Sequence, residues 1–309
     1  MLRRWTKTVA VLLTAAVALG VSACSTQSNT QSSTGSSDDG KIKVSVTFNA
    51  MKEFAEAVGK DKVEVSTIIP DGTEPHDFEP KAQDLAALSS ADIFVYNGLG
   101  METWVEDAVS AAKNDKLIVV EASKGAEPIT NTDAGEIEEH GQYDPHLWLS
   151  LKGAEIEAEN IKNALVEADA KNADYYEKNY DEFAAQLEGI YNEYSPKFQS
   201  SEKKSFVTGH AAFGYLCRDF GLEQNSVEDV FAEGEPTAQQ LTELVQYCKD
   251  NGVTTIFAEE MASPEVSQTL ADEVGAEVKT IYTIESAEDN MSYVDRMKDN
   301  LSKIYSSLS

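Results

Sequence analysis

Residues 63–98 read VEVSTIIPDGTEPHDFEPKAQDLAALSSADIFVYNG. This stretch begins and ends with a short apolar run, at residues 63–69 and 91–98, and such runs are typical of buried strands. Between them, Leu85 and Leu88 are spaced as on one face of a helix, which predicts a short helical connection. A strand, a helix and a second strand in this order indicate neighbouring strands of a parallel sheet.

The same alternation extends in both directions from this stretch. Further strands are expected at residues 41–48 and 117–122, with helices near 51–58 and 105–112 between them. After residue 201 the alternation resumes, with strands expected at 204–209, 254–259 and 277–285 and a weaker strand around 225–230. Thr237 and Gln240 form a predicted capping box at the start of one of the intervening helices. The fold class is therefore α/β, with two lobes that each hold a mostly parallel sheet flanked by helices.

The middle of the chain has a different pattern. From Gly153 to Phe198 there is no strand signal, and large apolar residues recur every three or four positions: Tyr176, Tyr180, Phe183, Leu187, Ile190, Tyr194 and Phe198. This spacing predicts a long rigid helix of roughly 35 Å that joins the lobes. The predicted organisation is an N-terminal lobe at residues 41–150, a helical linker at 151–200 and a C-terminal lobe at 201–309.

The first 40 residues predict export and attachment to a membrane. Residues 1–23 combine three basic residues with an apolar stretch, as a secretory signal peptide does. They end in Val-Ser-Ala before Cys24, which resembles the bacterial lipobox; the alternative is an ordinary signal peptide followed by an incidental cysteine. Residues 24–40 are polar and predict a flexible tether. We therefore expect a protein that is lipid-anchored through Cys24 on the extracytoplasmic face of the cell membrane.

Charge excludes some partners. The chain carries a net charge of −29, which becomes −32 after residue 23 because the segment removed has three basic and no acidic residues. Such an acidic protein is not expected to bind nucleic acid or an anionic lipid surface, so the only expected membrane contact is the lipid anchor. Two cysteines remain after Cys24, namely Cys217 and Cys248, each on the apolar face of a predicted helix. The sequence allows two interpretations, either two buried free thiols or a disulfide between them.

Histidine placement indicates a metal site. The chain has four histidines, and three of them, His76, His146 and His210, lie in turn-like motifs, of which at least two follow predicted strands. Ligands of open α/β sheets bind beyond the carboxyl ends of the strands. Histidine is the commonest protein ligand for transition metals. Three histidines in such positions therefore predict convergence on one ion, across a cleft between the lobes.

These motifs carry a family resemblance. GTEPHDFEP, LSSADIFVYNGLGMETW, YDPHLWLS, GHAAFGYLCRDFGL and IFAEEMASPEV together resemble the solute-binding lipoproteins of bacterial zinc and manganese ABC transporters, the cluster A-I group. The resemblance covers the chain from about residue 41 to its end, together with the lipobox. It implies that His76, His146 and His210 bind the metal with a carboxylate at Glu285, just after the last strand. It also implies a monomer that delivers Zn²⁺, as transported ligand, to an ABC transporter permease and its ATPase.

The chain departs from the family pattern at several positions. Phe78 stands where the family usually has tyrosine, and the loop before the second histidine motif, EIEEHGQY, is acidic with only His140 in it. Glu259 and Glu260 compete with Glu285 as the carboxylate ligand, and we assign Glu259 a hydrogen-bonding support role instead.

The ligand set favours Zn²⁺ over Mn²⁺, because imidazole nitrogens suit zinc and manganese prefers oxygen ligands. A manganese-binding member of the same family is the first alternative. A zinc-dependent hydrolase is the second, although the chain has no His-Glu-x-x-His motif and a filled fourth position leaves no site for an activated water. A surface adhesin or structural lipoprotein is the third. We therefore expect a binding protein and not an enzyme.

Overall fold

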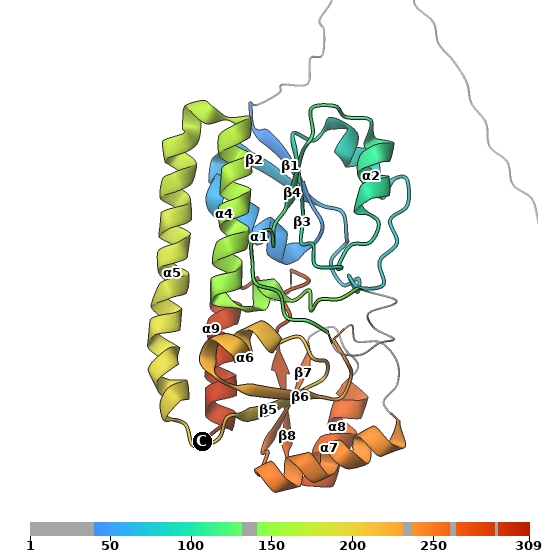
Figure 1. Ribbon diagram of the computed structural model, residues 1–309, viewed down its shortest axis with the longest axis vertical. Coiled ribbons are helices and arrows are strands. Elements are labelled where there is room, and N and C mark those ends of the chain that lie inside the picture. Colours follow the sequence, from blue (N-terminus) through green and yellow to red (C-terminus); the bar gives the residue numbers. More distant parts are fainter. Residues whose placement is uncertain (1–39, 132–140, 231–236, 260–263, 288–289) are drawn as a thin grey trace, which may run out of the picture. The chain divides into compact units, whose positions relative to one another are not determined.

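The structure is a computed structural model that describes residues 40–131, 141–230, 237–259, 264–287 and 290–309. Gly40 to Ser309 cluster as one compact unit, shown in Figure 1. The expected signal peptide, Cys24 and all of the expected tether but Gly40 lie outside the described residues, so these assignments stay predictions. Within the described part of the chain, no helix combines the length and the apolar character needed to cross a membrane.

The first four strands form one parallel sheet. Its order is β2-β1-β3-β4. Strand β2 lies on one side of β1, and β3 and β4 follow on the other side, so the strand order reverses between β1 and β3. The strands are flanked by helices α1 and α2 and by the 3₁₀ segment η2, which occupies the predicted short helix. The bounds are β1 Ile42–Val46, α1 Asn49–Gly59, β2 Val63–Thr67, η2 Asp84–Ser90, β3 Ile93–Tyr96, α2 Val105–Ala112 and β4 Ile118–Glu121. A further 3₁₀ turn, η1 Lys60–Lys62, precedes β2.

The last four strands repeat this arrangement. Their order is β6-β5-β7-β8, every pair is parallel, and the reversal falls between β5 and β7. The bounds are β5 Ser205–Thr208, α6 Gly214–Phe220, β6 Glu223–Ser226, α7 Ala238–Asn251, β7 Thr255–Glu259, α8 Pro264–Val274, β8 Glu277–Ile281 and α9 Tyr293–Ser307. The predicted fold class of two parallel α/β lobes is confirmed. The predicted capping box is present, since Thr237 and Gln240 bond each other's backbone N–H at the start of α7.

The predicted linker contains the expected long helix and a second helix before it. η3 Leu147–Leu149 leads into α4 Leu151–Ala168, and α5 Ala173–Ser200 follows after the 3₁₀ turn η4 Ala170–Asn172. At 28 residues, α5 is about 42 Å long. The two helices run side by side (Figure 1). The predicted long helix is therefore confirmed as α5, with α4 packed beside it, and the boundaries proposed for the lobes and linker stay predictions.

The helix α5 packs against elements that belong to both sheets' layers. Phe183 contacts Phe54 of α1 and Tyr293 of α9, with ring centroids 5.8 and 6.1 Å apart. Toward its C-terminal end, Tyr191 packs against Phe220 of α6 with ring centroids 5.1 Å apart. These buried aromatic contacts explain the periodic pattern read from the sequence, because one face of α5 is apolar along its whole length.

The two cysteines lie in different hydrophobic clusters. Cys217 packs with the large core around α1, α4, α5 and α9, whereas Cys248 packs with the cluster under α7 and α8. Both are buried free thiols, and burial raises the pKa of the Cys248 thiol to about 11. The disulfide alternative is therefore wrong in this structure.

Candidate metal centre

Three of the four candidate ligands follow strands of the two parallel sheets. His76 follows β2 in the first sheet, and His210 comes two residues after β5 in the second. Glu285 lies four residues after β8, and His146 lies immediately before η3. Parallel strands place their carboxyl ends at one edge of a sheet, which is where ligands of such sheets bind. Two sheets facing each other at these edges bring the four residues together.

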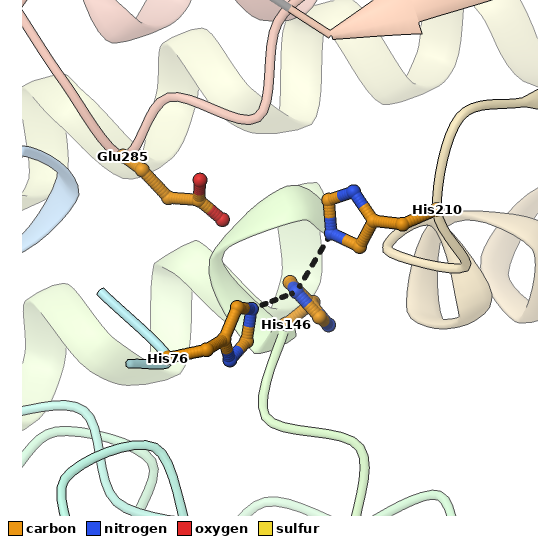
Figure 2. A group of neighbouring side chains, drawn as sticks. All are labelled: His76, His146, His210 and Glu285. Atoms are coloured by element: carbon orange, nitrogen blue, oxygen red, sulfur yellow. Dashed lines mark hydrogen bonds between the residues drawn. The ribbon is translucent and has the colours of Figure 1, made fainter. Parts of the chain in front are cut away.

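Figure 2 shows the four side chains pointing toward one another. The Nε2 atom of His146 lies 3.1 Å from Nε2 of His76 and 3.3 Å from Nε2 of His210. One ligand atom from each of the four residues lies within 4.8 Å of the other three. A tetrahedral zinc ion with bonds of about 2.0–2.1 Å separates its nitrogen ligands by about 3.3–3.4 Å. The observed nitrogen spacing therefore fits a single tetrahedral ion.

Asp144 fixes the orientation of His146. Its Oδ1 accepts hydrogen bonds from the backbone N–H and from Nδ1 of His146, both at 2.9 Å. A proton held on Nδ1 leaves the lone pair on Nε2, which is the nitrogen that faces the other histidines. His146 is fully buried and Asp144 nearly so. Asp144 therefore selects the tautomer that can bind a metal.

Glu259, the last residue of β7, contacts His210 in a similar way. Its Oε1 accepts the backbone N–H of His210 at 3.1 Å and lies 3.6 Å from Nδ1. Gly209 makes this approach possible, because a Cβ at that position would lie 1.9 Å from Oε2 of Glu259. These contacts agree with the support role expected for Glu259. Glu260, the competing carboxylate, lies outside the described residues.

The segment that carries Glu285 has an unusual backbone. Ile284, just before the ligand, has a φ of +62°, a region that β-branched residues rarely adopt. Thr283 donates from Oγ1 to Oε2 of Glu285 at 3.0 Å, and the Glu285 carbonyl accepts the N–H of Asn49 at 3.2 Å. The segment is therefore bonded to the N-terminus of α1, in the other lobe.

Trp148 connects two of the ligand segments. This fully buried residue of η3 packs against the His146 ring at 5.1 Å and donates from Nε1 to the carbonyl of Thr283 at 2.7 Å. Tyr293 of α9 in turn donates to the carbonyl of Trp148 at 2.6 Å. His146 and Glu285 are thus held through one indole side chain, although they come from distant parts of the sequence.

Burial keeps the His210 imidazole in the neutral form that can bind a cation. Burial, followed by the nearby His146, lowers the pKa of His210 well below its ordinary value of 6.5, so this imidazole stays neutral near neutral pH. A neutral imidazole can bind a metal and a protonated one cannot. Beside the cluster, burial raises the pKa of Glu74, whose carboxylate accepts the backbone N–H of His76.

His76 is the least buried of the four ligand candidates. A groove of about 950 Å³ opens beside it, between the residues around η2 and helix α2. Phe78, the departure from the family pattern, lines this groove and packs against Trp104 with ring centroids 6.1 Å apart. The groove gives solvent a path toward the His76 side of the cluster.

The structure brings together all four residues expected to bind the metal, whereas His140 and most of its acidic loop lie outside the described residues. Sequence reasoning missed Asp144, Thr283 and Trp148. Asp144 had a local signal, since a carboxylate two residues before a predicted ligand is placed to bond its imidazole. Trp148 and Thr283 had none, because they meet across 135 residues of sequence.

Comparison with known proteins supplies the family. Residues 44–307 match the family described as the periplasmic zinc-uptake complex component A, ZnuA. The chain is 38% identical to the high-affinity zinc uptake system protein ZnuA of Bacillus subtilis (strain 168), covering 100% of this chain and 99% of that protein. It is 46% identical to a protein of Treponema pallidum (strain Nichols) named for metal binding, over 86% of each chain.

A solved structure gives the same result. The laminin-binding protein Lmb of Streptococcus agalactiae, described as bifunctional with adhesin and metal transporting activity, superposes with a TM-score of 0.79 at 34% identity. The match covers 87% of this chain and 100% of Lmb. The described lobes therefore have the architecture of a solved metal-transport protein.

Proposed function

We propose a function that proceeds from one fact: the chain belongs to the periplasmic zinc-uptake component A family. Members of this family are solute-binding components of a transport system and not enzymes. We propose that the protein captures one Zn²⁺ ion outside the cytoplasm and delivers it to an ABC transporter permease, which its ATPase drives. The protein acts as a monomer, anchored to the membrane through a lipid on Cys24.

The observation that carries this proposal is the convergence of three imidazoles and one carboxylate. His76, His146, His210 and Glu285 offer ligand atoms within 4.8 Å of one another, and three of the four residues are buried. Four protein ligands complete the tetrahedral shell of zinc. Such a closed site holds its ion as cargo, because no position is left for a water to be activated as a nucleophile. This disfavours the hydrolase alternative.

The donor set supports zinc over manganese. Three of the four ligands are nitrogen atoms, and divalent zinc binds such sites more tightly than divalent manganese. The zinc-uptake relatives agree with this preference. Adhesion, the third alternative, is favoured by the descriptions of laminin-binding streptococcal neighbours. We place transport first because three of the four residues of the metal cluster are buried rather than displayed on the surface.

Zinc titration tests the binding step. The full chain in mild detergent is freed of metal and titrated with Zn²⁺ against a chromogenic chelator of known affinity. We expect one tight site, lost or weakened by at least 100-fold in His76→Ala, His146→Ala and His210→Ala. His140→Ala is the matched control, because it removes the one histidine of the chain that is not among the expected ligands. Wild-type affinity in all three cluster variants contradicts the proposal.

A growth experiment tests delivery. A strain lacking the protein should grow poorly in zinc-depleted medium, and the wild-type chain should restore growth where the His146→Ala chain does not. If both chains restore growth, zinc binding at the cluster is not needed for growth, which favours a structural or adhesive role over transport. Growth that responds to manganese but not to zinc favours the manganese alternative.

A further inference from the structure

The turn between β3 and α2, residues 97–104 (NGLGMETW), lies outside the metal cluster and has an unusual backbone. Gly98, Leu99 and Gly100 have φ values of +91°, +58° and +95° in succession. Leucine rarely adopts this left-handed region, because its Cβ meets the following carbonyl oxygen. A turn with such a backbone persists only where its surroundings hold it.

Glu102 holds this turn from inside. Its Oε1 accepts the backbone N–H of Asn97 at 2.9 Å, and its Oε2 accepts the backbone N–H of Gly98 at 3.0 Å. Successive backbone N–H groups pointing to one side form a concave anion site, and here the anion is a carboxylate of the same turn. Glu102 is only 7% exposed, so its carboxyl oxygens have little access to water and depend on hydrogen bonds within the protein, of which these two bind the turn.

Asn97 carries the effect of the turn to the metal cluster. Its side chain is fully buried, and Nδ2 donates to the carbonyl of Pro145 and to the carbonyl of Gly98, both at 2.9 Å. Pro145 immediately precedes His146. The Asn97 side chain therefore links the end of β3 to the peptide group between Pro145 and His146.

We infer that Asn97 and Glu102 are positioning residues for His146: Glu102 fixes the turn, and Asn97 fixes the carbonyl of Pro145 before the ligand. This inference rests on the proposed function, since it assigns two further residues to the same zinc site. Asp144 sets the tautomer of the imidazole from within its own segment, whereas Asn97 sets where that segment lies relative to the first sheet.

The chemistry of zinc makes such positioning measurable. Loss of an outer hydrogen bond that orients a ligand typically weakens metal binding by about 10- to 100-fold. Asn97→Asp keeps the size of the side chain but replaces the donor with an acceptor that faces two carbonyls. Glu102→Gln replaces one acceptor with an amide donor that faces a backbone N–H. Both substitutions oppose the observed bonds without leaving a large cavity.

Three measurements on the metal-free full chain in detergent test the inference. These are the Zn²⁺ affinity by chelator competition, the visible absorption of bound Co²⁺ as a probe of ligand geometry, and the free energy of unfolding in denaturant. We expect Asn97→Asp and Glu102→Gln to weaken zinc binding by about 10- to 100-fold and to change the Co²⁺ spectrum. Glu106→Gln, an exposed residue of α2, is the matched control and should change neither.

A double-mutant cycle separates positioning from general stability. Asn97→Asp should cost no further zinc affinity in a His146→Ala background, because the ligand it positions is already absent. If the stronger variants do not fold, Asn97→Ser and Glu102→Asp, which each keep part of the bonding, decide the question by the same measurements. Folded variants with wild-type zinc affinity and an unchanged Co²⁺ spectrum overturn the inference.

The outcomes also distinguish this inference from the proposed function. A wild-type chain without a tight zinc site refutes the proposed function itself. A wild-type chain that binds zinc, loses it in His146→Ala and keeps it in the Asn97 and Glu102 variants refutes only the positioning role. Variants that lose stability but not zinc affinity show that the turn serves the fold alone, which also overturns the inference.

Discussion

Replacing Asp144 with asparagine isolates the contribution of one carboxylate to metal binding. Asp144 accepts two hydrogen bonds from His146, both 2.9 Å long and both assisted by its negative charge. Charge-assisted bonds are about twice as strong as neutral ones. Asparagine keeps an acceptor oxygen but loses the charge, and its amide no longer enforces the proton on Nδ1. We expect zinc affinity to fall by about 10- to 100-fold, or about 1.4–2.7 kcal/mol.

The assay is chelator competition at neutral pH, with Asp219→Asn as the matched control. Asp219 is another buried carboxylate, but it accepts from Ser150 at the start of α4 and does not contact the cluster. The control should lower stability without lowering zinc affinity. Equal zinc affinity in Asp144→Asn and wild type refutes the tautomer argument, and equal losses in both variants show that buried charge in general, and not this contact, is responsible.

Three further predictions concern charge, anchoring and selectivity. Burial raises the pKa of Glu102 from 4.5 to about 7, so the folded state binds this proton more tightly than the unfolded state. The free energy of unfolding therefore falls as the pH rises from about 4.5 through about 7. At about 1.4 kcal/mol per pH unit, the loss is about 3 kcal/mol. Denaturant unfolding of the metal-free protein between pH 5 and pH 8 should show a shallower decline in Glu102→Gln than in wild type, and identical slopes contradict this. Cys24→Ser should move the protein from washed membranes to the soluble fraction. Retention of this variant in the membranes argues against a lipid anchor. His210→Glu makes the site richer in oxygen, so metal competition should show weaker zinc binding and a narrower preference over manganese; an unchanged preference means that His210 is not a ligand.

The alternating strands and helices could be predicted because their side chains show the burial pattern directly. β1, β3 and β7 are mostly buried in the sheets, with Lys43 of β1 exposed, and each lies inside its predicted range. The weaker strand was predicted around residues 225–230, but β6 spans Glu223–Ser226. Its residues are polar because it is an edge strand, so backbone pairing with β5 defines it and periodicity does not.

The break between α4 and α5 had no clear signal in the sequence. Residues 168–173 contain neither glycine nor proline, and alanine, lysine and asparagine are all tolerated within helices. The turn depends on Asp169, whose carboxylate accepts hydrogen bonds from Asn172 and from the hydroxyl of Tyr176. Such bonds replace the helical ones only when the returning helix packs against the first, which is a tertiary effect.

The three candidate histidines could be predicted because histidine is rare in this chain and each of the three lies within a recognisable motif. Their supporting residues could be predicted only where the contact is local. Asp144 lies two residues from its imidazole, whereas Asn97 meets Pro145 across 48 residues and Trp148 meets Thr283 across 135. Sequence spacing carries no information about such distant hydrogen bonds until the two sheets have been placed.

The spacing of the three imidazoles has a consequence for copper. Nε2 of His146 already lies about as far from Nε2 of His76 and of His210 as zinc requires, and the same lone pairs are open to any divalent ion of similar size. Among first-row metals, Cu²⁺ stands above Zn²⁺ in its affinity for nitrogen donors. The donor chemistry of His76, His146 and His210 therefore does not by itself exclude copper. Selectivity against copper must then come from the tetrahedral arrangement of the ligands, which Cu²⁺ does not prefer, and from the supply of each metal.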